Sequence, residues 1–86
     1  MTNHRTHGGW KSPIYVEDPA TGQTSIIRNA KQAKTVLAQA WPAYHGSQFG
    51  RAERTCDEAL AGSSTPNEAR CAFIAAAVEA HLHLHS

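Results

Sequence analysis

Trp41-Pro42, Cys56-Asp57-Glu58-Ala59-Leu60-Ala61-Gly62 and Ala69-Arg70-Cys71-Ala72-Phe73 are the three stretches that decide the fold of this chain. Their small and apolar residues have the spacing of helix faces that pack against one another. Together they describe a helical core. They do not define a reaction, because their residues are mostly small and apolar and report on packing.

Two β-rich runs precede these stretches. Residues 14–16 (IYV) and 24–28 (TSIIR) flank a segment dense in turn formers, which predicts a β-hairpin. An isolated hairpin is marginally stable in water, so this one is expected to rest on helices. At the other end, residues 81–85 (HLHLH) alternate. As a strand they place both leucines on one face and the histidines on the other, which is the more economical interpretation.

The first two helices are marked by their ends. Asn29 is a good N-cap for a helix that Pro42 ends, because proline disfavours helix at the preceding residue and has no amide proton. Ser47 is the expected cap of a second helix over residues 48–61. Gly62 suits the left-handed position just beyond that helix.

The third helix, over residues 66–80, has the strongest start signal in the chain. Thr65 is its cap, Pro66 occupies the first helical position, and Glu68 closes a capping box. Its wheel is apolar on two sides, which is typical of a helix sandwiched between neighbours. One side should meet the other helices, and the second should meet the hairpin or another subunit. The first side comprises Ala69, Phe73, Ala76 and Ala80, and the second comprises Cys71, Ile74 and Val78.

These elements predict an α+β fold, in which an N-terminal β-hairpin with a short C-terminal third strand packs on three α-helices. The chain has 86 residues, which is one small domain; we expect a disordered tail over residues 1–9 and a single domain over 10–86. The formal net charge is +1 without a basic block, so nucleic acid is not an expected partner. The longest apolar run, residues 71–78, is far shorter than the ~20 residues that span a membrane. With no secretory signal evident, we expect a cytoplasmic protein without membrane contact.

His81, His83 and His85 are the sharpest candidates for a metal site, because imidazole is a common metal ligand. Three observations weigh against the site. Same-face residues of a strand are nearly 7 Å apart, from a rise of about 3.3 Å per residue, so three imidazoles reach one ion only if the strand bends. The segment also ends the sequence, and no acidic residue lies nearby in sequence to orient an imidazole. No cofactor is expected.

Cys56 and Cys71 lie on either side of the turn between the second and third helices. In a cytoplasmic chain the simple interpretation is two reduced thiols that pack as small apolar groups. The alternative is a bridge between two antiparallel helices.

Arg70 lies between the two apolar sides of the third helix, so its stem should be partly buried and its guanidinium needs an acceptor. One interpretation is a structural ion pair with a carboxylate of the second helix. The other is contact with an anion, a carboxylate ligand or a partner. Tyr44 and His45, in the loop before the second helix, are further candidates for partner contact. The carboxylates available for the ion pair are Glu53, Asp57 and Glu58.

The order of these residues resembles a known family. It runs Trp10-x-x-Pro13-x-x-Val16, Trp41-Pro42, Ala52-x-x-x-Cys56-x-x-Ala59-Leu60-x-Gly62 and Ala69-Arg70-x-Ala72-Phe73-x-x-Ala76-Ala77-x-Glu79-Ala80. This resembles the small alphaproteobacterial family known as domain of unknown function 982, over about residues 10–84. The resemblance implies a single-domain cytoplasmic protein with no assigned activity, cofactor or catalytic residue. His81 departs from it, at a position expected to suit a small residue such as glycine.

We therefore expect a non-enzymatic binding or regulatory module that self-associates or docks a protein partner. The second apolar side of the third helix motivates this expectation, because a chain this small gains stability from a partner subunit. The alternative is a small-molecule or metal-binding protein that uses Arg70 or the C-terminal histidines.

Overall fold

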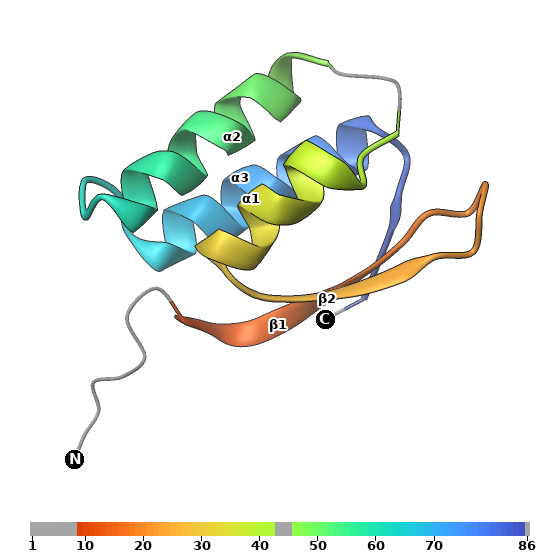
Figure 1. Cartoon of the computed structure of the whole chain (residues 1–86), viewed down its shortest axis with the longest axis horizontal. Coiled ribbons are helices and arrows are strands. Elements are labelled where there is room, and N and C mark those ends of the chain that lie inside the picture. The colour runs from red at the N-terminus through yellow and green to blue at the C-terminus, as the bar shows by residue number, and fades with distance from the viewer. Residues whose placement is uncertain (1–8, 43–45, 86) are drawn as a thin grey trace.

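Three helices cover one face of a three-stranded sheet (Figure 1). The computed structural model describes residues 9–42 and 46–85. Of the tail expected at its start, residues 1–8 lie outside the described part, and Gly9 begins the first strand. The predicted α+β fold is confirmed. Its elements are β1 (Gly9–Glu17), β2 (Thr24–Asn29), α1 (Ala30–Gln39), α2 (Ser47–Leu60), α3 (Pro66–Glu79) and β3 (His83–His85).

The sheet has the strand order β2-β1-β3, and both pairs are antiparallel. The hairpin turns at Asp18, whose carbonyl accepts hydrogen bonds from the amides of Thr21 and Gly22. Gly22 has a φ of 76°, which glycine adopts without steric cost. The C-terminal strand is present, and it pairs with β1 so that Leu84 lies opposite the buried Val16. Within the sheet, β1 is therefore the central strand, and β2 and β3 are the two edge strands.

The C-terminal strand begins at His83, two residues later than the alternation predicted, because α3 ends in a specific turn. The amide of His81 donates to the carbonyl of Val78, and the amide of Leu82 donates to that of Ala77, at 3.0 Å each. These two bonds form a Schellman motif, which requires a left-handed residue after the helix. His81 is that residue, with a φ of 62°. At the end of α2 the same position is occupied by Gly62, with a φ of 86°.

Because a side chain is disfavoured in the left-handed region, His81→Gly should raise the free energy of unfolding by about 0.5–1 kcal/mol. Urea denaturation at constant pH measures the change. His83→Gly is the matched control, since the same substitution in an extended strand should lower stability. A lower stability for His81→Gly would contradict the assignment of the motif.

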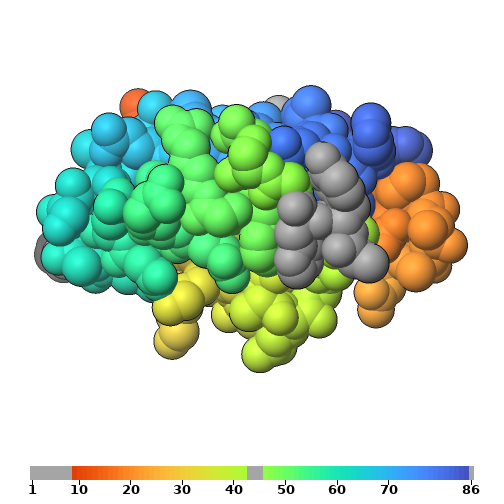
Figure 2. Space-filling view, turned by 90° about the horizontal axis from the view of Figure 1, so that it is seen from above, coloured from red at the N-terminus to blue at the C-terminus, as the bar shows by residue number. Residues whose placement is uncertain are grey.

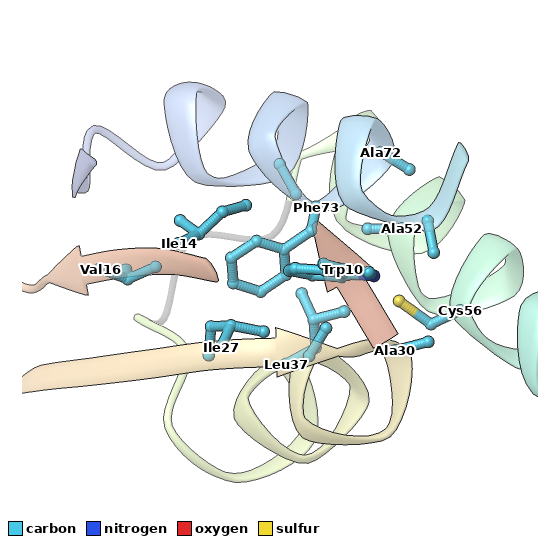
Figure 3. Close-up of a cluster of buried hydrophobic side chains, with 13 residues drawn as sticks. Trp10, Ile14, Val16, Ile27, Ala30, Leu37, Ala52, Cys56, Ala72 and Phe73 are labelled. Atoms are coloured by element: carbon cyan, nitrogen blue, oxygen red, sulfur yellow. The ribbon is translucent and has the colours of Figure 1, made fainter. Parts of the chain in front are cut away.

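A chain of aromatic rings forms the centre of the core. Phe73 of α3 is fully buried, and its ring centroid lies 6.2 Å from that of Trp10 and 5.5 Å from that of Trp41. Trp41 in turn lies 5.9 Å from Phe49 of α2. Tilted and edge-on aromatic pairs at such distances add to the stability gained from burial. Figure 3 shows Phe73 pointing from α3 toward the sheet, with Trp10 beside it.

The start of α2 is capped from another helix. Ser47 was expected to be its N-cap, but this was wrong: the N-cap is Gly46, and Ser47 is already helical. The missing acceptor is supplied by Glu79 at the end of α3, whose Oε1 accepts from the amide of Gln48 at 2.8 Å. The hydroxyl of Ser47 donates to Oε2 of the same carboxylate at 3.3 Å. A Cβ at Gly46 would overlap this carboxylate, which explains why a glycine fits there.

Glu79→Ala should lower the free energy of unfolding by about 1 kcal/mol, the usual cost of losing an N-cap. Considered within α3 alone, the same change should be neutral or stabilising, because an acidic residue is unfavourable at a helix C-terminus and alanine is a good helix former. The sign therefore tests the contact between helices. Urea denaturation of Glu53→Ala, which removes a carboxylate elsewhere, serves as the control.

Candidate functional site

The side chain of Arg70 points to the sheet and not to α2. Its Nε donates to the backbone carbonyl of Ser12 in β1 at 3.0 Å, and the residue is half-buried. The expected ion pair with a carboxylate of α2 was wrong, since no salt bridge of Arg70 is found among residues 9–42 and 46–85. Asp57 of α2 pairs instead with Lys34 of α1. The rotation of α3 that buries Phe73 also turns Arg70 toward β1.

The Ser12 carbonyl that accepts from Arg70 lies in an irregular stretch of β1. The pairing of β1 with β2 is regular from Ile14 onward, but its register shifts between Gly9 and Ile14. Pro13, in this stretch, has no amide to donate to a neighbouring strand. Arg70 of α3 thus contacts β1 where its pairing with β2 is irregular.

A pocket of about 500 Å³ lies beside this contact, between the start of β1 and the start of α3. Residues 9–12, residues 65–67 and Arg70 line it. Two of these residues, Lys11 and Arg70, are cationic, and none of the described residues that line the pocket is acidic. The pairing of Lys11 with Arg70 in one pocket was not predicted, because nothing in the sequence indicates that the start of β1 and the start of α3 lie side by side.

The structure separates the three C-terminal histidines. His83 and His85 lie in β3 and are exposed, whereas His81 lies in the left-handed turn before the strand. Glu17 of β1, opposite His83 in the sheet register, places Oε1 3.6 Å from His83 Nδ1. This acidic neighbour is distant in sequence and depends on strand pairing. Within the described ranges, no three His, Cys, Asp or Glu residues form a group that could hold a metal ion.

The other predicted contacts have different outcomes. Tyr44 and His45 lie outside the described residues. Cys56 and Cys71 are free thiols, the first buried and the second exposed. Burial raises the pKa of the Cys56 thiol from 9.0 to about 11. Cys56 is therefore an apolar packing group of α2, and it is neutral at physiological pH.

At pH 8, the exposed Cys71 should react with a thiol reagent rapidly. The buried Cys56 should react at least about 100-fold more slowly, because burial shields it and raises its pKa from 9.0 to about 11. A Cys71→Ser variant should lose the fast phase, and urea should release the slow thiol. Because the folded pKa of Cys56 is raised, the free energy of unfolding should fall as pH rises from about 9 to about 11. Equal rates for both thiols in the native protein would contradict this assignment.

The fold and the pocket define a small α+β domain with a cation-lined cavity at one end of its sheet. The sequence model of a family described as "Protein of unknown function (DUF982)" matches residues 12–84, so the chain belongs to that family. The match confirms the resemblance, and it includes both Ser12 and Arg70. No curated protein and no solved structure matches the chain. Among the described residues, none of the helices has the length and apolar character needed to cross a membrane.

Proposed function

We propose that this chain is a non-enzymatic cytoplasmic binding module that pairs with a second copy of itself through the outer face of α2 and α3. The observation that supports this most directly is Val78, which is 61 % exposed and is the most exposed large apolar side chain of the described residues. Cys71, two turns earlier on α3, is also exposed. Ile74, the third member of the predicted second side, packs against the core.

The charge pattern on the outer face of α2 and α3 is the reason that we propose a second copy of the chain as the partner. The start of α2 lies beside the end of α3, as the contact between Gln48 and Glu79 requires, so the two helices are antiparallel. Figure 2 looks onto the helix layer, with α2 and α3 side by side. A shallow groove between them is lined by Arg51 and Arg54 nearer the start of α2, and by Glu58 and Glu68 toward the other end.

A face with a basic and an acidic end is complementary to itself under a twofold axis that runs across the helices. Such an axis places the basic end of one copy over the acidic end of the other. Cys71, which lines the groove, would then meet the second copy near the axis, and Val78, two turns along the same side of α3, would meet it farther out, toward the basic end. No charged side chain occurs from Cys71 to Val78, so little desolvation would oppose contact.

Sedimentation velocity at high micromolar concentration should show a dimer for the unmodified chain. Val78→Glu should raise the dissociation constant by about tenfold or more, because it places a charge in the apolar part of the interface. Leu60→Glu is the matched control: Leu60 is 50 % exposed, but at about 100° per residue it lies on the side of α2 opposite Arg51, whereas Val78 lies on the same side of α3 as Cys71. The dimer of the Leu60→Glu variant should therefore be as stable as that of the unmodified chain. Arg54→Glu should weaken the dimer, and less so at high salt.

Three outcomes would count against this function. One is a monomer at every concentration. A second is a dimer that Ile26→Glu dissociates and Val78→Glu does not, since Ile26, opposite Tyr15 in the register, is exposed on the sheet. The third is a stable complex with a different protein that Val78→Glu abolishes while the free chain stays monomeric.

The alternative function is the binding of a small molecule or a metal ion. The pocket beside Arg70 is the observation that favours binding of a small molecule. The metal-binding form has less support, since His81 lies in a turn outside the strand of His83 and His85.

A further inference from the structure

We propose that the pocket between β1 and α3 binds a small molecule that carries an oxyanion, a carboxylate or a phosphate, on an apolar body. Arg70 and Lys11 are the residues that would hold the anion. Of the described residues, Asn67 alone lines both this pocket and the groove of α2 and α3, and neither Arg70 nor Lys11 lines the groove, so the proposed anion contacts do not depend on self-association.

The first step of the argument is the orientation of Arg70. Its Nε is engaged by the Ser12 carbonyl at 3.0 Å, and this is its one hydrogen bond to the described residues. Because the guanidinium is planar, that bond fixes the directions of the two terminal amino groups. The terminal groups form a fork that matches the two oxygens of a carboxylate or phosphate. The backbone carbonyl of Ser12 thus orients the half-buried Arg70, and the two terminal amino groups of its guanidinium stay available to bind a ligand.

The second step is the charge around the fork. A half-buried cation without a carboxylate partner is costly, and an anion in the pocket would offset that cost. Lys11 lines the same pocket and adds a second positive charge. The acidic residue nearest in sequence, Glu68, is directed to the capping box, where its Oε1 accepts from the Thr65 amide at 2.7 Å. Its side chain lines the other groove, beside Cys71.

The third step is the size and lining of the pocket. A volume of about 500 Å³ is within the range of small-molecule sites, which is roughly 300–1,000 Å³. Trp10 contributes an apolar wall, held in place by its contact with Phe73, and Pro66 adds to it. Ser12 and Asn67 supply polar groups near the cations. An inorganic ion alone would leave the apolar wall unused, so we infer a ligand with an apolar body.

The test is a titration followed by proton–nitrogen NMR of the labelled full chain. The probes are benzoate, phenyl phosphate, inorganic phosphate and the neutral benzyl alcohol, each to about 10 mM, which detects millimolar dissociation constants. Benzoate or phenyl phosphate should shift the Arg70 Nε–H and Trp10 indole signals in a saturable way. Inorganic phosphate should bind more weakly, and benzyl alcohol should not bind. The stronger of the two aromatic anions identifies the oxyanion.

Variants locate the site. Arg70→Met should weaken binding by about tenfold or more, the loss expected for charge-assisted hydrogen bonds, and Arg70→Lys should recover only part of it. Lys11 is exposed, so Lys11→Met leaves the Ser12 contact intact and should weaken binding by a smaller factor. Arg54→Met, an arginine in the other groove, removes the same charge and should leave binding unchanged.

Three results would overturn the proposal. The first is the absence of saturable shifts for every anion. The second is equal weakening by Arg54→Met and Arg70→Met, which would indicate attraction to net charge alone. The third is that the Lys11→Met variant and the Arg70→Lys variant both bind the aromatic anions as tightly as the unmodified chain does. None of these results bears on the dimer, which sedimentation tests separately.

Discussion

The packing of Phe73 between Trp10 and Trp41 is the contact on which the rest of the structure depends. It joins α3 to the first strand and to Trp41, two residues after α1, and it fills the centre of a core in which many of the other residues are alanines. Alanines let helices approach closely but bury little area each. A domain of this size therefore relies on a few large rings for most of its apolar burial. The rings also set the rotation of α3.

That rotation determines both candidate surfaces. Once Phe73 faces the core, Arg70, one turn earlier, is directed toward β1, while Cys71 and Val78 are directed outward. The oriented guanidinium and the exposed apolar stretch are consequences of one helix placement. The two proposals rest on different chemistry, a fixed cation in one case and apolar contact with complementary charge in the other. The two surfaces adjoin at Asn67, which lines both the pocket and the groove.

The features that could be predicted from the sequence are those encoded locally. The capping box of Thr65 and Glu68 is confirmed, and so is the cap of α1 by Asn29, because each depends on side chains within one turn. The alternation of histidine and leucine after α3 correctly predicted a third strand, because this pattern too is contained in a few consecutive residues. Contacts between distant segments were missed. Nothing near Glu79 in the sequence indicates that it caps α2, and nothing near Arg70 indicates a carbonyl more than fifty residues earlier.

The left-handed His81 also has a consequence for the order in which the native structure opens. It joins α3 to an edge strand of three residues that pairs only with β1 among the described strands. Detaching that strand breaks few hydrogen bonds and relieves the disfavoured conformation, so it costs little free energy. Amide protons of β3 would exchange with solvent by this local opening, well before those around Phe73. The open form would uncover Val16, opposite Leu84 in the register, while the helix layer stays folded.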